Sequence, residues 1–199
     1  MRAMTVLRIV RRGRSRHAKE MFSVPDHSLV LLINPDIACR TELPDEVRTR
    51  LENSCDLLRR ILRAASVPAR LLGAAEEIRA SFAAITNCEV ILNDPIDIWR
   101  DQHVIDCLGP PETQVLYLGG AWLEEEVLIA ALSAARIGYD TRVFTDLSVL
   151  RSLLDRTPAL DRLVQHGILT TTVRQTVMEW SLAAPNEDLA RRLRTMLDQ

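Results

Sequence analysis

The sequence predicts an α/β fold in which a six-stranded parallel sheet lies between two layers of helices. Short apolar runs recur along the chain, and such runs are typical of strands that are buried on both faces. Amphipathic helical segments separate them, and this alternation is typical of parallel sheets. The chain has 199 residues, of which 47% are hydrophobic and 26% charged. That composition suits one medium-sized domain with a single core.

The first half of the chain is predicted to hold three strands and two helices. Pro35 ends the first apolar run, SLVLLIN. Pro44 and the two acids after it favour the start of a helix, whose apolar residues then recur every three or four positions. The predicted strands are 28–34, 67–72 and 89–93, and the predicted helices are 44–65 and 74–84.

The second half is predicted to hold three more strands and most of the helices. Gly138 is placed to end a helix, and the sequence PNED at 185–188 is placed to cap the last one. The predicted strands are 113–118, 139–144 and 168–171. The predicted helices are 122–136, 147–154, 158–166, 173–183 and a final amphipathic helix after residue 188.

One long stretch resembles a known family. Residues 115–139 read VLYLGGAWLEEEVLIAALSAARIGY, followed by RVFTD at 142–146 and GILTT at 167–171. In order and spacing this is similar to the isochorismatase-like cysteine hydrolases, which include nicotinamidases and related amidases. The resemblance covers about residues 28–182. It implies a three-layer α/β/α domain, usually oligomeric, and fits Asp146 to the acidic residue of the family's fifth strand.

The residues that the family uses for catalysis are changed in this chain. The family has an Asp after the first strand, a Lys after the third and a Cys in the helix after the fourth. By the resemblance these positions fall on Asn34, Asn93 and Glu126. The chain has a single lysine, Lys19, so no lysine is available in the core, and Arg does not replace it as a proton shuttle. Without the thiolate and the Asp, the family's acyl-enzyme chemistry is not expected.

No metal or cofactor is expected. The family's metal-binding Asp and His residues follow the second strand, where this chain reads LLGAAEE at 71–77. The four histidines show no ligand spacing, and His166 before Gly167 suits the end of a helix.

Polar residues that follow the strands form the candidate pocket, because ligands bind at the carboxyl ends of parallel strands. Clustered carboxylates raise one another's pKa and can then act as general acids. The plainer interpretation places the two Asp residues in proline turns and the run of Glu residues at a helix N-terminus, and it gives Trp122 the role of filling the former substrate cavity. The candidates are Asp36, Asp94, Gly120, Ala121, Trp122 and Cys39, together with Asn34, Asn93 and Glu126.

Charge divides the chain into a basic arm, 1–24, and a single domain, 25–199. The arm has seven basic residues and one acid, a net charge of +6, and the remaining chain carries −8. The arm lacks the apolar region of a secretory signal. The four cysteines form no C-x-x-C pair, which favours reduced thiols in the cytoplasm.

Three functions remain open on the sequence. The leading hypothesis is an isochorismatase-like domain without the catalytic residues, which acts by binding as a structural or regulatory subunit. It predicts a homo-oligomer, with a protein partner or a small-molecule ligand as further options and no membrane partner. The alternative is a divergent hydrolase that uses Glu126 with Asp36 or Asp94 on a small molecule. A nucleic-acid module that acts through the arm is disfavoured by the acidic body.

Overall fold

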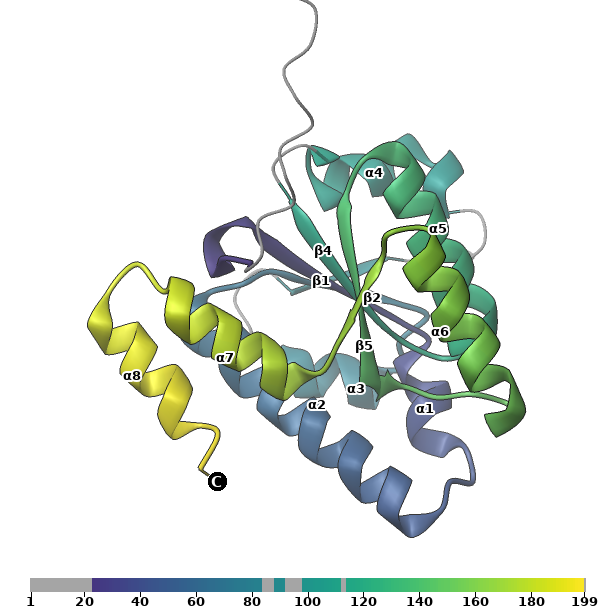
Figure 1. Ribbon diagram of the computed structural model, residues 1–199, viewed down its shortest axis with the longest axis horizontal. Helices are drawn as coiled ribbons and strands as arrows, with labels where there is room; N and C mark the ends of the chain where they lie inside the picture. Colours follow the sequence, from purple (N-terminus) through teal and green to yellow (C-terminus); the bar gives the residue numbers. More distant parts are fainter. Residues whose placement is uncertain (1–22, 84–87, 92–97, 112–113, 199) are drawn as a thin grey trace, which may run out of the picture.

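The computed structural model describes residues 23–83, 88–91, 98–111 and 114–198. Its six strands form one parallel sheet in the order β3-β2-β1-β4-β5-β6, which confirms the predicted fold class (Figure 1). The strands are β1 Ser28–Ile33, β2 Ala69–Leu72, β3 Cys88–Ile91, β4 Val115–Gly120, β5 Asp140–Ser148 and β6 Leu169–Thr171.

Helices cover both faces of the sheet (Figure 1). One layer holds α2 (Asp45–Ala65), α3 (Glu76–Phe82), α7 (Val173–Ala183) and α8 (Glu187–Thr195). The other holds α4 (Gln102–Leu108), α5 (Leu128–Ile137) and α6 (Arg156–Gln165). The short helix α1 (Pro35–Arg40) follows β1 directly. No helix in the described ranges combines the length and the apolar character needed to cross a lipid bilayer.

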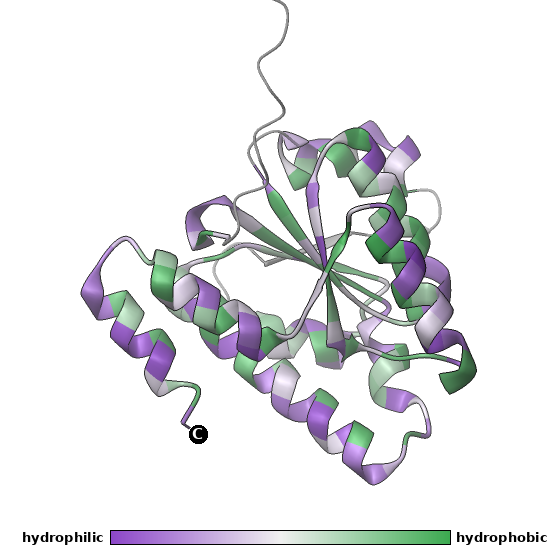
Figure 2. Cartoon of the chain, in the orientation of Figure 1, coloured by the Kyte–Doolittle hydropathy of each residue, from purple (hydrophilic) through white to green (hydrophobic). Residues whose placement is uncertain are grey.

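The core lies in two clusters, one on each side of the sheet. All six residues of β1 are buried, and they alternate between the two sides. Val30 and Leu32 pack with α2 and α7, whereas Leu29, Leu31 and Ile33 pack with α4 and α5. Figure 2 shows the strands mostly hydrophobic and the helices with hydrophilic residues interspersed. The continuous apolar runs in the sequence thus correspond to strands covered on both faces.

One predicted helix is wrong, and two helices were not predicted. Residues 147–154 do not form a helix, because β5 continues to Ser148 and pairs with the end of β4. Val149 donates its N–H to the carbonyl of Gly120, and only the 3-10 turn Leu153–Asp155 remains helical. Backbone pairing with β4 therefore outweighs local propensity in this segment. The unpredicted helices α1 and α4 have six and seven residues, too few to show a clear apolar period.

The register of β1 against β4 brings the predicted site together. Leu32 lies beside Gly119 and Ile33 beside Gly120, so both strands end at the same level. The N–H of Ala121 donates to the carbonyl of Ile33 at 2.9 Å. The segments after the two strands, which begin at Asn34 and Ala121, consequently meet at the carboxyl edge of the sheet.

Candidate functional site

Asn34 joins the ends of three neighbouring strands. It follows β1 in the left-handed region, with φ 44° and ψ 49°. Its backbone N–H donates to the carbonyl of Leu72, at the end of β2, at 2.7 Å. Its side-chain Nδ2 donates to the carbonyl of Ala121, after β4, at 3.5 Å. The amide that stands at the family's Asp position therefore makes structural hydrogen bonds.

Two glycines allow this close approach of the strand ends. A Cβ atom at Gly120, whose φ is +123°, would lie 1.8 Å from the carbonyl oxygen of Ile33. A Cβ atom at Gly73, whose φ is +68°, would lie 2.2 Å from Oδ1 of Asn34. A side chain at Gly120 would therefore displace the β1 backbone, whereas a side chain at Gly73 would displace the Asn34 side chain, and both glycines have a positive φ.

Glu126 turns back onto the start of its own helix. After Ala121 and Trp122, which are joined by a cis peptide bond, the chain forms a π-helical turn over Leu123–Val127 and continues as α5. The N–H of Trp122 donates to Oε2 of Glu126 at 3.0 Å. Unpaired N–H groups at a helix start need such acceptors, and a carboxylate there also interacts favourably with the helix dipole. The Glu126 carboxylate acts as a cap.

The neighbouring glutamates bind the loop after β5. Glu124 accepts the backbone N–H of Arg151 at 2.7 Å, and Glu125 pairs with Nε of Arg151 at 2.8 Å. The Arg151 guanidinium lies 4.5 Å from the centre of the Trp122 ring. Trp122 is 8% exposed and belongs to the core cluster on the α2 side. Trp122 is therefore a core residue in this structure, and its role in filling a former substrate cavity stays a prediction.

The Asp36 carboxylate also accepts a hydrogen bond, away from the junction at Asn34. Oδ1 of Asp36 accepts the backbone N–H of Ala75 at 2.7 Å, which connects α1 to the loop before α3. Asn93 and Asp94 lie outside the described residues. The structure therefore brings Asn34, Gly120, Ala121, Trp122 and Glu126 to one junction, whereas Asp36 belongs to a neighbouring contact.

A cavity of about 150 Å³ lies beside this junction, between α1, α2 and α3. Gly120 and Cys39 line it, as do Leu32 of β1 and Leu147 of β5. Asn34, Asp36, Trp122 and Glu126 do not line it. Its lining is mainly apolar, and the two described carboxylates proposed for acid–base chemistry, Asp36 and Glu126, lie outside it.

The two thiols of the cavity are protonated at neutral pH. Burial raises the pKa of Cys55 to about 12, and the neighbouring Cys39 contributes in the same direction. The pKa of Cys39 is also raised, by burial and then by Asp36. A protonated thiol is a weak nucleophile. Cys39 and Cys55 therefore line the cavity, and we do not expect either thiol to act as a nucleophile.

Asp146, which the resemblance fits to the family's fifth strand, is a structural link. It is 7% exposed, and its carboxylate accepts the hydroxyl of Ser54 at 2.8 Å and the N–H of Val173 at 3.1 Å. These contacts join β5 to α2 and to the start of α7. Over the described ranges, no three His, Cys, Asp or Glu side chains are placed to hold a metal ion together.

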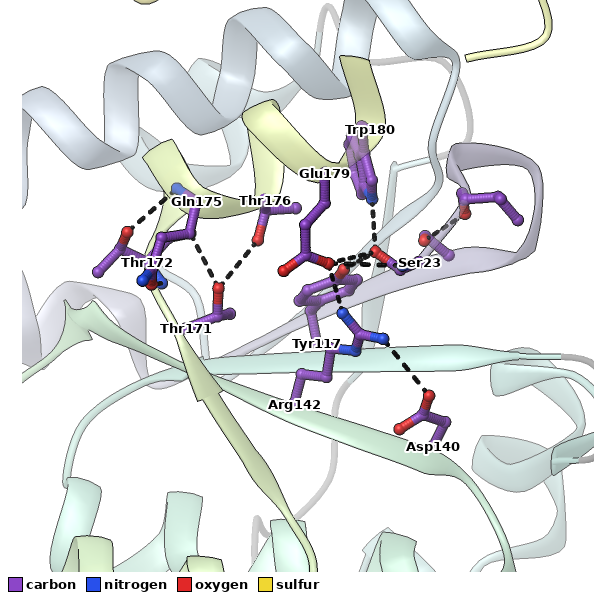
Figure 3. Close-up of polar contacts among 12 residues, drawn as sticks. Ser23, Tyr117, Asp140, Arg142, Thr171, Thr172, Gln175, Thr176, Glu179 and Trp180 are labelled. Atoms are coloured by element: carbon purple, nitrogen blue, oxygen red, sulfur yellow. Dashed lines mark hydrogen bonds and ion pairs between the residues drawn. The ribbon is translucent and has the colours of Figure 1, made fainter. Parts of the chain in front are cut away.

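A buried polar cluster around Ser23 was missed in the sequence (Figure 3). The Ser23 hydroxyl is hydrogen-bonded to the Tyr117 hydroxyl and accepts Nε1–H of Trp180 at 3.1 Å. Below them Arg142, only 2% exposed, forms an ion pair of 2.6 Å with Glu179. Ser23 lies in the predicted arm, yet it is 2% exposed and anchors the segment before β1 to β4 and α7. No sequence signal marks this cluster, since its members lie up to 157 positions apart.

No protein-family model and no curated protein matches the sequence, but solved structures match the fold. YcaC from Pseudomonas aeruginosa aligns with a TM-score of 0.72 at 18% identity, covering 89% of this chain and 91% of that chain. The chain has the isochorismatase-like cysteine hydrolase fold. YcaC from Escherichia coli, described as an octameric hydrolase of unknown specificity, has a TM-score of 0.64 and 21% identity over 89% and 97% of the two chains. The nicotinamidase of Staphylococcus aureus has a TM-score of 0.60 and 15% identity over 73% and 99%.

The point where the strand order of the sheet reverses is the expected place for a ligand in this fold. Ligands of open parallel sheets bind where the strand order reverses, which in this sheet is between β1 and β4. At that point the described chain presents an amide, two glycines and a carboxylate that is hydrogen-bonded to its own helix. This set of groups can bind and support structure, but it offers no free nucleophile.

Proposed function

We propose that this protein is a non-catalytic member of the isochorismatase-like fold, which acts by binding as a structural or regulatory subunit. The observation that carries the proposal is the 3.0 Å hydrogen bond from the Trp122 N–H to the Glu126 carboxylate. It gives the residue at the family's nucleophile position a structural role. Asn34 and Asn93 at the other two positions support the same conclusion, since a side-chain amide does not ionise near neutral pH and cannot act as a general acid or base.

The same proposal includes assembly with copies of itself and a cytoplasmic location. The E. coli YcaC structure is described as octameric, and this chain leaves large apolar side chains exposed, with Leu153 at 72% and Leu154 at 88%. Exposed apolar patches are typical of protein interfaces. The thiols of Cys39 and Cys55 form no disulfide with any described residue, which supports a reducing compartment.

Product formation over a panel of small amides, vinyl ethers and carbamates tests the proposal. The wild type is compared with Glu126→Ala and with Glu125→Ala, a matched control whose carboxylate pairs with exposed Arg151. We expect no product above the buffer rate from any of the three proteins. Turnover by the wild type that survives in Glu125→Ala and disappears in Glu126→Ala would establish the divergent hydrolase and overturn the proposal.

A further inference from the structure

The cavity between α1, α2 and α3 has the size and the lining of a small-ligand site. Its volume is about 150 Å³. Its apolar wall comes from Leu32, Leu51, Ile78, Phe82 and Leu147. A cavity of roughly 150 Å³ lined by Leu, Ile and Phe side chains is large enough to hold benzene. The space therefore suits one six-membered ring or a branched alkyl group of similar size.

Two arginines of α2 give this apolar space a cationic rim. Arg48 and Arg59 both line the cavity and are half-buried. Arg59 pairs with Asp56 at 3.3 Å and lies 5.9 Å from the centre of the Phe82 ring. Arg48 donates to two neutral acceptors, the carbonyls of Thr41 at 3.2 Å and Cys39 at 3.5 Å.

The Arg48 charge is the one that a ligand can neutralise. Within the part of the chain that the structure describes, no carboxylate lies within salt-bridge distance of Arg48. A half-buried guanidinium binds a carboxylate through charge-assisted hydrogen bonds, which are about twice as strong as neutral ones. Glu52 lies one helical turn from Arg48, is exposed and lines the same cavity. Its negative charge favours a ligand with one carboxylate over a ligand with two.

We propose that this cavity binds a small apolar monocarboxylate, with its hydrocarbon part inside and its carboxylate at Arg48. The site adjoins the junction at Gly120 but is not lined by Asn34 or Glu126. The inference goes beyond the proposed function and does not depend on it. Turnover lost in Glu126→Ala would refute the non-catalytic proposal and leave this site standing, whereas a failure of ligand binding would refute the site alone.

Benzoate is the probe, with benzyl alcohol as its neutral analogue and phthalate as the dianion. Binding to the full chain is followed by ligand-observed NMR. We expect benzoate to bind, and Arg48→Met to weaken benzoate at least about tenfold while benzyl alcohol changes less than about twofold. Arg40→Met is the matched control, because Arg40 lies on the neighbouring helix α1, is exposed and does not line the cavity. Phthalate should bind more weakly than benzoate.

Filling the cavity tests where the ring lies. Ala38 is 3% exposed and lines the cavity, so Ala38→Leu should abolish the binding of both benzoate and benzyl alcohol. Ile78→Trp is a second filling variant from the half-buried wall, for use if circular dichroism shows that Ala38→Leu does not fold. In the unmodified protein, saturating benzoate should slow alkylation of the exposed Cys39 by iodoacetamide.

Three results would overturn the site. They are no benzoate binding to the wild type, equal benzoate affinity in Arg48→Met and the wild type, or unchanged binding in a folded cavity-filling variant. Each of them would show that the cavity does not recognise a small monocarboxylate.

Discussion

At the scale of single residues, the Glu126 carboxylate makes a structural hydrogen bond at the start of its own helix. Its carboxylate accepts the Trp122 N–H, and its neighbours Glu124 and Glu125 bind Arg151. A cap stabilises a helix, whereas a carboxylate held for catalysis typically destabilises the fold. The sign of a stability change at Glu126 therefore separates the two functions.

Glu126→Ala should lower the free energy of unfolding by about 1 kcal/mol, since the Trp122 N–H loses its acceptor. Urea denaturation followed by circular dichroism measures this change. Glu125→Ala is the control, with an expected change within about 0.5 kcal/mol because its ion pair is exposed. A Glu126→Ala protein more stable than the wild type would indicate a residue kept for catalysis.

Gly120→Ala should prevent folding or destabilise the protein by at least about 4 kcal/mol, because its Cβ would meet the Ile33 carbonyl. Gly167→Ala is a matched control. Gly167 also has a positive φ, of +69°, but within the described residues no atom beyond its chain neighbours lies within 4 Å of its Cβ position. Its expected cost is about 1–2 kcal/mol of backbone strain. Thermal denaturation compares them, and similar melting temperatures would contradict the close packing of β1 against β4.

At the scale of helices and strands, the sequence predicts an element well where its signal is local. Pro44 and the acids after it mark the start of α2, and Gly138 marks the end of α5. The predicted helix over residues 147–154 is wrong for the opposite reason, because the conformation of this segment depends on pairing with β4, which lies about 30 positions away. The Ser23 anchor depends on contacts that are more distant still.

Ser23→Ala should destabilise the fold by about 1–3 kcal/mol, because it leaves the buried Trp180 Nε1–H and Tyr117 hydroxyl without this partner. The control is Ser81→Ala, whose hydroxyl donates to the Ile78 carbonyl of its own helix. Chemical denaturation of both variants provides the measurement. Equal stability of Ser23→Ala and the wild type would mean that the segment before β1 is not anchored in solution.

The thiol of Cys55 should make the protein less stable at alkaline pH. Its pKa is about 12 in the fold and 9.0 when unperturbed, so above pH 9 the unfolded chain loses a proton that the folded chain retains. Stability falls as the pH rises from 9 towards 12. Cys55→Ala should show a shallower fall across this range in denaturation at successive pH values. An identical pH profile for both proteins would show that the fold does not raise the pKa of Cys55.

At the scale of the whole molecule, the parallel sheet and its covering by two layers of helices follow from the alternation of apolar runs and helices, whereas the order of the strands is seen only in the structure. The cavity does not follow from the sequence, since it depends on how α1, α2 and α3 meet, and α1 has only six residues. The hydrogen bonds from backbone N–H groups to the carboxylates of Glu126 and Asp36 also cannot be predicted from the sequence, because they depend on the three-dimensional arrangement of the loops. A fold shared with hydrolases therefore does not determine whether this chain catalyses a reaction.

The most direct test of the non-catalytic proposal is a single-turnover experiment with the protein in excess over nicotinamide, a small aromatic amide. Product is measured by mass spectrometry after prolonged incubation, so that even one turnover per protein molecule is detected. We expect no nicotinate above the buffer control. Nicotinate formed by the wild type and absent with Glu126→Ala would contradict the binding function and identify an enzyme.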